Sequence, residues 1–519
     1  MRQSLHWRWI SVLCACIGGS QGLEVDYGAC HSACITLSNL GLAVSPQSEY
    51  VAPFHQDPLH VSEGDATPLF WAQQQQSAQP ACLVHPQSPE EIAVLIATAR
   101  STGCPFAVRG GGHSDIPGAS NSDGGITVNM AGLGRVEVDE AAGVARVGAG
   151  AKWGDVYREL EKTNRTVVGG RLRDVGVGGL LLGGGLSHLS GLHGWACDNV
   201  RNYEVVLANG SIIQVSQSTH PDLYRALRGG GNSFGVVTRF DLDLVAQGPM
   251  WGGLHVWPLL PSVTSALTEA FAKFAHEAPS DPHVSLFAGL GHMQGNFAWA
   301  VGQYDTLGRE EPPIFSRFRD DAQVYGAGKI VSTARVTTLS DLAEELNQSE
   351  PPGKRSRFTT ATFRVDAELL QQMVGFFVEQ VEKALANGLD KDEGFAPMLG
   401  IQPLTRNILK QQAKRAGNVM GLAEEDGPLM VCSFGWEWSH EADDATVIAG
   451  IKAVLGQAVD AAKERGLYHP FKYMNYAAED QDPVSSYGAD SVGFLKKVRD
   501  MYDSDGVFTE LVPGWFKIM

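Results

Sequence analysis

The sequence predicts an α+β protein in which a glycine-rich, ligand-binding part is followed by an antiparallel sheet covered by helices. Short apolar runs alternate with glycine clusters over the first half of the chain. After Gln247 glycine becomes sparser, tryptophan becomes more frequent, and longer strands and helices are expected. Such a mixture suits a single antiparallel sheet with helices packed on it.

Length and charge limit the classes of partner. The 519 residues exceed one average domain and predict two or three. Hydrophobic residues make up 44% of the chain, which is enough to bury large cores. The formal net charge of −18 argues against nucleic acid or an anionic membrane surface as a partner. We expect a monomer that acts on a small molecule.

The N-terminus has the pattern of a secretory signal. Arg2 and Arg8 supply positive charge around a short apolar stretch from Trp9 to Gly19, and small residues follow. The stretch is too short to span a bilayer, and no later stretch is long and apolar enough. We therefore expect residues 1–22 to be removed and the protein to be secreted or held in the secretory lumen.

A secreted setting permits glycans and disulfides. Sequons at Asn164, Asn209 and Asn347 predict a glycoprotein. Six cysteines follow the predicted signal, and none has the spacing of a zinc site. They are Cys30, Cys34, Cys82, Cys104, Cys197 and Cys432.

The first elements are indicated by capping signals. Residues 23–77 are polar, contain four consecutive glutamines, and are expected to form an irregular arm on the body of the protein. Ser88 has the features of a helix N-cap, with proline next and glutamate three residues on. Apolar residues at helical spacing follow as far as Gly103, where the helix should end. A short buried strand is expected from Cys104 to Val108.

Later elements follow from periodicity and turn signals. The dipeptide Asn209-Gly210 between two alternating runs predicts a hairpin over 204–215. Other strands are expected at 126–130, 136–138, 144–147, 236–242, 254–257, 284–290, 297–304 and 430–438. Other helices are expected at 153–160, 220–227, 262–278, 367–387 and 443–466.

The first glycine loop, Arg109–Ser114, reads Arg-Gly-Gly-Gly-His-Ser and follows the strand that ends at Val108. Glycines let a backbone approach a ligand closely, and successive N–H groups can form a concavity for anions. The run ends in His113, and a simple phosphate-binding loop has no such histidine. Taken alone, the loop is equally compatible with a tight turn.

The second glycine cluster runs from Gly169 to Gly194, where ten of the 26 residues are glycine. Gly176-Val177-Gly178 begins like a Rossmann fingerprint, but Leu181 stands where the third glycine belongs. The lysine and hydroxyl pair of a P-loop is absent too. Two glycine loops of this kind suggest a long ligand with several polar parts, held mostly by backbone N–H groups.

In combination these motifs resemble the FAD-linked oxidoreductases of the vanillyl-alcohol oxidase fold, in the berberine-bridge-enzyme-like branch. Further matching segments occur in the same order: 194–200, Gly229–Gly235, Tyr473–Tyr476 and Tyr502–Phe508. The ending is similar to that of secreted fungal members, many of which serve secondary-metabolite pathways. The resemblance covers nearly the whole mature chain.

The resemblance implies a particular domain arrangement. A PCMH-type, two-part FAD-binding domain would occupy residues 78–247. A substrate domain over 248–465 would roof the isoalloxazine ring, and residues 466–519 would return to the FAD domain.

The resemblance also implies FAD joined to His113 through an 8α-histidyl bond. Imidazole is a good nucleophile, and a covalent link raises the flavin potential and prevents loss of the cofactor outside the cell. Some members add a second bond through a cysteine, but Leu172 stands there, so we expect a single bond and a lower potential. Cys197 is not assigned that role. The other implied cofactor contacts are Arg109, Gly110, Gly111, Gly112, Ser114, Val175, Gly176, Gly178, Gly179, Gly183, Gly184, Gly185, Asp198, Asn199, Val200, Gly235, Val236 and Asn475.

The implied reaction is oxidation of a small alcohol, phenol or polyketide, with the flavin carrying the redox chemistry. Dioxygen would reoxidise the flavin and yield hydrogen peroxide, because small residues over 175–179 leave room for oxygen. The alternatives are a carbohydrate or primary-alcohol oxidase, and a flavoprotein pocket that acts mainly as a cyclase. Loss of the second covalent bond speaks against the sugar oxidases.

Two residues are candidates for the proton acceptor. Tyr473 matches the family tyrosine that points at the flavin, although a lone tyrosine is as often a packed core residue. Glu437 lies in an expected strand in which Phe434, Trp436 and Trp438 share the opposite face. Its side chain is expected to be solvated, and the alternative is that it faces the pocket.

The cysteines differ in what the resemblance implies. Cys34 and Cys82 match a pair that bridges the N-terminal arm to the body in similar fungal proteins. The others are expected to be buried thiols, and they are Cys30, Cys104, Cys197 and Cys432.

Overall fold

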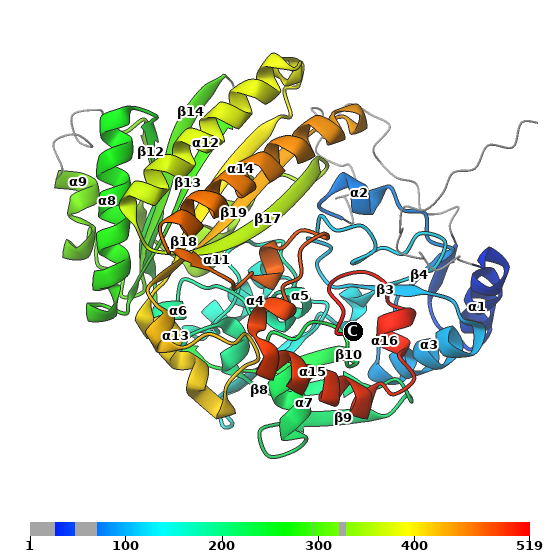
Figure 1. The fold of residues 1–519 in the computed structure, drawn as a ribbon. Helices are drawn as coiled ribbons and strands as arrows, with labels where there is room; N and C mark the ends of the chain where they lie inside the picture. The colour runs from blue at the N-terminus through cyan, green and yellow to red at the C-terminus, as the bar shows by residue number, and fades with distance from the viewer. Residues whose placement is uncertain (1–25, 47–69, 294, 321–327) are drawn as a thin grey trace, which may run out of the picture.

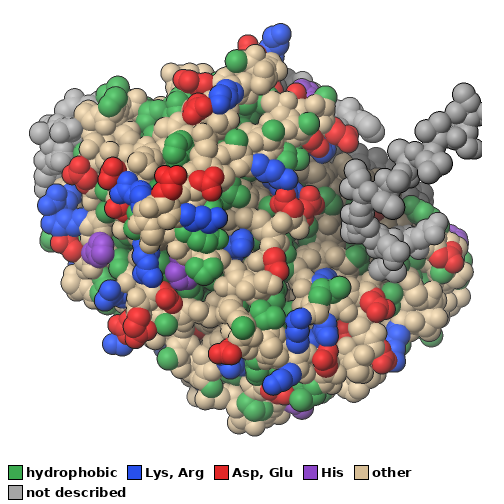
Figure 2. All heavy atoms as spheres, in the orientation of Figure 1, with side chains coloured by type: hydrophobic (Ala, Val, Ile, Leu, Met, Phe, Trp, Pro, Cys, Tyr) green, Lys and Arg blue, Asp and Glu red, His purple; other side chains and the backbone are tan. Residues whose placement is uncertain are grey.

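The computed structural model describes residues 26–46, 70–293, 295–320 and 328–519. Two small sheets lie on one side of the molecule and one large sheet on the other (Figure 1). The predicted signal, residues 1–22, lies outside the described residues. Acidic and basic side chains are interspersed over the face seen in Figure 2.

The first sheet has four strands in the order β1-β2-β4-β3, and β2 and β3 both run parallel to β4. Its crossover helix α3 confirms the capping signals: Ser88 Oγ accepts a hydrogen bond from the N–H of Glu91, and Gly103 adopts φ 71°. The elements are α1 (Tyr27–Asn39), β1 (Val44–Pro46), α2 (Gln73–Gln76), β2 (Cys82–Val84), α3 (Pro89–Thr102), β3 (Phe106–Arg109) and β4 (Ile126–Asn129).

The second sheet is antiparallel, with five strands in the order β5-β6-β10-β8-β9. The expected hairpin is confirmed, because β8 pairs with β9 across the turn at Asn209-Gly210. β7 and β11 pair with each other as a separate two-stranded sheet. The elements of this part of the chain are β5 (Val136–Asp139), β6 (Val144–Gly148), α4 (Trp153–Glu161), β7 (Arg165–Thr166), α5 (Val177–Leu182), α6 (Ser190–His193), β8 (Val200–Val206), β9 (Ile212–Ser216), α7 (Pro221–Ala226), β10 (Val236–Asp243) and β11 (Val245–Ala246).

The large sheet has nine strands and is antiparallel throughout, with helices α8, α12 and α14 lying across one face (Figure 1). The elements are β12 (Met250–Pro258), α8 (Pro261–Glu277), β13 (Val284–Met293), β14 (Asn296–Asp305), α9 (Arg317–Asp320), β15 (Val331–Ser332), β16 (Arg335–Thr337), α11 (Leu339–Gln348), β17 (Arg355–Arg364), α12 (Ala367–Ala386), β18 (Ala396–Leu404), α13 (Arg406–Lys410), β19 (Leu429–Trp438), α14 (Asp444–Glu464) and β20 (Tyr468–His469).

The hydrophobic residues form two cores. One lies between the large sheet and its helices and contains the predicted tryptophan face of β19, Trp436 and Trp438. The other unites the two small sheets with the end of the chain. That end contains α15 (Ala489–Tyr502) and α16 (Val507–Glu510), after which the carbonyl of Leu511 accepts a hydrogen bond from the N–H of Phe106.

The described parts of the arm, residues 26–46 and 70–77, contain regular elements, contrary to expectation. Helix α1 begins at the N-cap Asp26, whose carboxylate accepts hydrogen bonds from two backbone N–H groups. Its buried face has helical spacing and consists of Cys30, Ala33, Cys34 and Leu37. The four glutamines of α2 are also structural, because Gln75 is fully buried and accepts a hydrogen bond from the N–H of Asn121.

Two disulfides attach α1 to the first sheet. Cys34–Cys82 is present, as the resemblance implied. The expectation of free thiols at Cys30 and Cys104 is wrong, since these residues form a second bridge with a Cα–Cα distance of 4.9 Å. Cys30 and Cys34 lie one helical turn apart, so both face the sheet. Cys197 and Cys432 are buried free thiols, as expected.

Two further expectations need correction. The Asn347 sequon is not open to a glycan in this fold, because the side chain is buried and bonded on both sides to Asp174 at 2.9 Å. Asn164 and Asn209 are exposed. Residues Glu441–Glu464 are, by length and composition alone, able to cross a membrane. Here this segment is the helix α14, which packs against α12 with its apolar side in the core (Figure 1).

We predict that replacing both Cys30 and Cys104 by serine lowers the free energy of unfolding by about 3 kcal/mol. The path through the remaining bridge closes a loop of roughly 28 residues, and closing it costs entropy of that order. Urea unfolding under oxidising conditions measures the change, and the reduced wild type is the control. An unchanged urea midpoint of unfolding would show that the Cys30–Cys104 bridge does not constrain the unfolded chain.

Candidate functional site

The two glycine loops touch backbone to backbone. A Cβ atom on Gly111 would lie 2.3 Å from the nitrogen of Gly176, and one on Gly176 would lie 2.2 Å from the nitrogen of Gly111. No side chain fits at such distances, so glycine is required at both positions. The contact fixes the histidine-bearing loop against the start of α5. Gly110 and Gly178 both approach the carbonyl of Ala149 in the same way.

The first loop presents a row of free N–H groups. Within the described residues, the backbone nitrogens of Gly111, Gly112, His113 and Ser114 donate to no other group. Gly112 has φ 71°, which turns the chain so that consecutive N–H groups converge. Such a concavity suits a diphosphate. Arg109 does not enter it, because its guanidinium donates to Asn129 at 2.7 Å and lies over Phe70.

His113 sits in an aromatic and acidic corner. Its ring stacks on Trp71 with 4.6 Å between centroids, and its Nε2 lies 3.9 Å from a carboxylate oxygen of Glu350. Burial lowers the pKa of His113 to about 4. Burial and the nearby carboxylate of Glu437 raise the pKa of Glu350 to about 7. Between these values both side chains are neutral, so the imidazole keeps a free lone pair.

Glu437 is not solvated, which corrects the expectation. Its side chain is 14% exposed and its carboxylate lies 3.2 Å from the Nζ of Lys354. Burial raises the pKa of Glu437 against the effect of this lysine. The residue faces the small sheets because the other face of β19 is filled by the tryptophans. It therefore belongs to the same acidic corner as Glu350.

The corner is held by contacts between the small sheets and the large sheet. The N–H of Trp71 donates to the carbonyl of Gly112 at 2.9 Å, and the indole donates to the carbonyl of Glu350 at 3.2 Å. Asp115 accepts a hydrogen bond from the N–H of Phe358 in β17 at 2.7 Å. Burial raises the pKa of this carboxyl to about 6.

Tyr473 and Asn475 line the second glycine cluster. The hydroxyl of Tyr473 accepts hydrogen bonds from the N–H of Gly185 at 3.1 Å and from the amide of Asn475 at 3.0 Å. Burial raises the pKa of Tyr473 well above its ordinary value, so it is neutral. The amide oxygen of Asn475 is buried and accepts no hydrogen bond from the described residues. A Cβ on Gly183 would lie 2.0 Å from that oxygen.

These features fit a flavin dinucleotide. The free N–H row suits the diphosphate, and the orphaned oxygen of Asn475 suits an imide N–H of the ring. A Cβ on Gly179 would meet no atom within 4 Å, which leaves open space beside the start of α5. Val175, before that helix, accepts a hydrogen bond from the N–H of Trp153.

The remaining residues that were expected to contact the cofactor lie later in the chain. Asp198 is fully buried, and accepts hydrogen bonds from the N–H of Trp195 and the amide of Asn418. Burial raises the pKa of Asp198 to about 6. The amide of Asn199 donates to the carbonyl of Trp195. This turn reaches the second cluster through bonds to the carbonyls of Gly184 and Gly185. The rest belong to strands of the second sheet or precede them: Val200, Gly235 and Val236.

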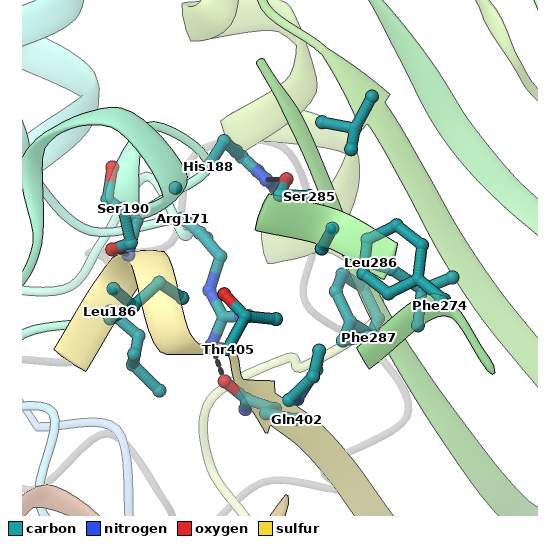
Figure 3. A pocket seen from close by; sticks show the side chains of 16 residues that line it. Arg171, Leu186, His188, Ser190, Phe274, Ser285, Leu286, Phe287, Gln402 and Thr405 are labelled. Carbon is teal, nitrogen blue, oxygen red and sulfur yellow. Dashed lines mark hydrogen bonds between the residues drawn. The ribbon is translucent and has the colours of Figure 1, made fainter. Parts of the chain in front are cut away.

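Several residues of the site escaped the sequence analysis, among them Trp71 and Glu350 beside His113. The guanidinium of Arg171 donates to Gln402 at 2.8 Å and to the hydroxyl of Tyr476 at 2.9 Å, beside a cavity of about 40 Å³ (Figure 3). His188 lines the same cavity from the second glycine cluster. Tyr476 belongs to a quoted motif and could have been singled out. Arg171 and His188 lie within the second glycine cluster but were not singled out there, and Gln402 belongs to no motif. The fold brings the three together.

Comparison with known proteins agrees with this geometry. A family model described as an FAD binding domain matches residues 80–216. The chain is 73% identical over 518 residues to FAD-dependent monooxygenase FUP4 of Fusarium proliferatum, with 100% of each chain covered. It is 69% identical over 510 residues to FAD-dependent monooxygenase tpcD of Cochliobolus heterostrophus, with 98% of each covered.

Solved structures share the fold. The 6-hydroxy-D-nicotine oxidase of Arthrobacter nicotinovorans superimposes with a TM-score of 0.71 at 22% identity, covering 92% of this chain and 98% of that one. The glucooligosaccharide oxidase of Acremonium strictum gives a TM-score of 0.71 at 20% identity, covering 92% and 97%. The latter is described with a 6-S-cysteinyl, 8α-N1-histidyl FAD.

We predict that the purified wild type retains yellow colour in the pellet after acid precipitation, and that His113→Ala releases it into the supernatant. The neutral imidazole of His113, beside the row of free N–H groups, is the expected nucleophile. The visible spectrum of the two fractions measures the outcome, with Cys197→Ser as the control that keeps its pellet colour. Colour that remains in the pellet of His113→Ala would place the bond elsewhere.

Proposed function

The chain belongs to the family of fungal FAD-dependent monooxygenases, which are FAD-linked oxidoreductases, and from that premise we propose that it oxidises a small organic alcohol, phenol or polyketide. The observation that carries the proposal is the neutral His113 at the end of a free N–H row, joined by the glycine contact to the Tyr473–Asn475 segment. We propose one covalent bond to His113, since Leu172 offers no thiol.

When bound, FAD supplies hydride acceptance from the substrate and electron transfer to dioxygen, which releases hydrogen peroxide. The protein positions this chemistry. The N–H row holds the diphosphate, and Asn475 orients the ring through its free oxygen. We assign cofactor binding to residues 78–247 and 466–519, and the roof over the substrate to 248–465.

We assign proton transfer to Glu350, beside Glu437, and not to Tyr473. Because the pKa of Tyr473 is raised well above its ordinary value, this residue acts as a positioning group that fixes Asn475 and Gly185. Glu350 has a pKa of about 7 and can accept or hold a proton near neutral pH. Glu437, paired with Lys354, sets the charge beside it.

Secretion is part of the proposal. Two disulfides support an oxidising compartment, and Asn164 and Asn209 are exposed for glycosylation. Covalent attachment of the cofactor would prevent its loss in such a compartment.

A monooxygenase is the second candidate, favoured by the names of the relatives. Isotopic oxygen distinguishes the two reactions once a screen of small alcohols, phenols and polyketides finds a substrate. We predict a product two hydrogens lighter than its substrate, without label from ¹⁸O₂, and one peroxide for each product formed. A product that gains one labelled oxygen atom would establish the monooxygenase reaction and refute the oxidase.

Glu350 gives a prediction for the pH dependence of stability. A carboxyl whose pKa is raised to about 7 on folding stabilises the protein fully below its unfolded value of 4.5, and this stabilisation is lost as the pH rises through 7. Between pH 5 and pH 8 the free energy of unfolding of the wild type should fall by on the order of 2–3 kcal/mol relative to that of Glu350→Gln. Urea unfolding of both proteins across this range measures the difference. If the free energies of unfolding of the two proteins changed in parallel with pH, the pKa of Glu350 would not be raised on folding.

A further inference from the structure

Arg171 places a positive charge beside the cavity, and none of the described carboxylates forms an ion pair with it. The side chain is half-buried, and the described residues place no carboxylate oxygen within 4 Å of its guanidinium. Arg173, two residues later, is paired with both Asp174 and Glu344. Arg171, which lines the cavity, therefore differs from Arg173 in having no ion-pair partner among the described residues.

The hydrogen bonds of Arg171 leave donors unused. A guanidinium has five N–H groups. Its hydrogen bonds to the amide oxygen of Gln402 and the hydroxyl of Tyr476 both come from Nη2. The amide of Gln402 also donates to the hydroxyl of Tyr476 at 2.6 Å, which fixes both acceptors. The guanidinium is thus positioned by neutral groups while its other face remains available.

The space beside Arg171 is a cavity of about 40 Å³ between the second glycine cluster and strands β13 and β18 (Figure 3). Leu186 and Phe287 give it apolar walls, and the guanidinium lies 5.5 Å from the Phe287 ring centroid. This volume exceeds what one water molecule needs. An apolar wall beside an unneutralised cation favours an anionic ligand, because water screens the charge poorly there.

His188 provides a second, independent observation. It is 2% exposed, and its Nε2 is buried without a hydrogen-bond partner among the described residues. Its Nδ1 contacts Ser285 Oγ at 3.3 Å, and its ring lies 3.9 Å from that of Tyr304. Burial and the charge of Arg171 lower the pKa of His188 well below its ordinary value, so it is a neutral hydrogen-bonding group. An unsatisfied polar atom beside the cavity points to a polar ligand group.

We propose that Arg171 binds an anionic oxygen of the substrate, so that the enzyme selects molecules with a carboxylate, an acidic enol or a phenolate over neutral alcohols and sugars. The proposal rests on the proposed function, since it names the substrate class of the same enzyme. Arg171 adjoins the predicted cofactor site through its hydrogen bond to Tyr476, whose ring centroid lies 4.8 Å from that of Tyr473. Gln402 and Tyr476 orient the guanidinium, and the apolar walls hold the adjoining carbon skeleton.

The test compares benzoate with benzamide, which share a ring and differ in charge at neutral pH. Binding to the purified holoenzyme is followed by tryptophan fluorescence, which needs no turnover. The variants are Arg171→Met, which removes the charge, and Arg171→Lys, which keeps it. Arg364→Met is the matched control, because it removes one exposed arginine charge whose guanidinium donates to the carbonyl of Asp426.

We expect the dissociation constant of benzoate to rise at least tenfold in Arg171→Met and less in Arg171→Lys, with benzamide unchanged within twofold. Arg364→Met should match the wild type. Arg171→Gln gives the same answer if the methionine variant does not fold. Unchanged benzoate affinity in Arg171→Met, or an equal loss of both ligands, would overturn the proposal.

The same data separate this proposal from the proposed function. Charge-dependent binding without covalent flavin or oxidation would support the anion site and refute the oxidase. Oxidation with a product two hydrogens lighter, together with benzoate binding that ignores Arg171, would support the oxidase and refute the anion site. If Arg171→Met changed the retention of flavin but not the affinity for benzoate, Arg171 would belong to the cofactor site. That result would also refute the anion site.

Discussion

The backbone contact between Gly111 and Gly176 is the constraint on which the site depends. Each glycine occupies space that a Cβ on the other would need, so the two loops can be this close only without side chains. The contact joins the loop that carries His113 to the start of α5, which leads to Gly183 and the Tyr473–Asn475 segment. One close approach thereby sets the relative position of both ends of the cleft.

The site holds two electrostatic environments. The imidazole of His113 is neutral above about pH 4, and the carboxyl of Glu350 is protonated below about pH 7. A neutral imidazole is the nucleophilic form, whereas Glu350 accepts a proton only once it has ionised. Arg171 has no carboxylate oxygen within 4 Å among the described residues, and its charge opposes the rise in the pKa of Glu350. The large sheet contributes to both environments, through Glu437 and Gln402.

The sequence predicted those features that have local signals. Ser88 and Gly103 bounded α3, the Asn209-Gly210 turn formed a hairpin, and the alternating face of β19 was assigned before the sheet was seen. Helix α1 was missed because its apolar face is short and half of it is cysteine. The Cys30–Cys104 disulfide was missed for the same reason, since Cys30 faces the sheet only if its segment is helical.

The site was less predictable because its side chains come from distant strands. Glu437 was expected in solvent, since alternation tells which face a residue takes but not what covers that face. The cover is the 350–354 segment, whose position depends on Trp71 and the first glycine loop. Arg171 and Gln402 lie more than two hundred residues apart, and no local pattern marks either of them. Their pairing follows from how the large sheet sits on the glycine clusters.

Peptide mapping of the purified holoenzyme by mass spectrometry tests the central claim most directly. The account predicts that the flavin mass is carried by a single peptide, the one containing Gly110–Ser114, with fragmentation placing it on His113. It also predicts unmodified peptides around Leu172 and Cys197. Flavin found on another residue, or released entirely free of peptide, would contradict the assignment of His113 as the point of attachment.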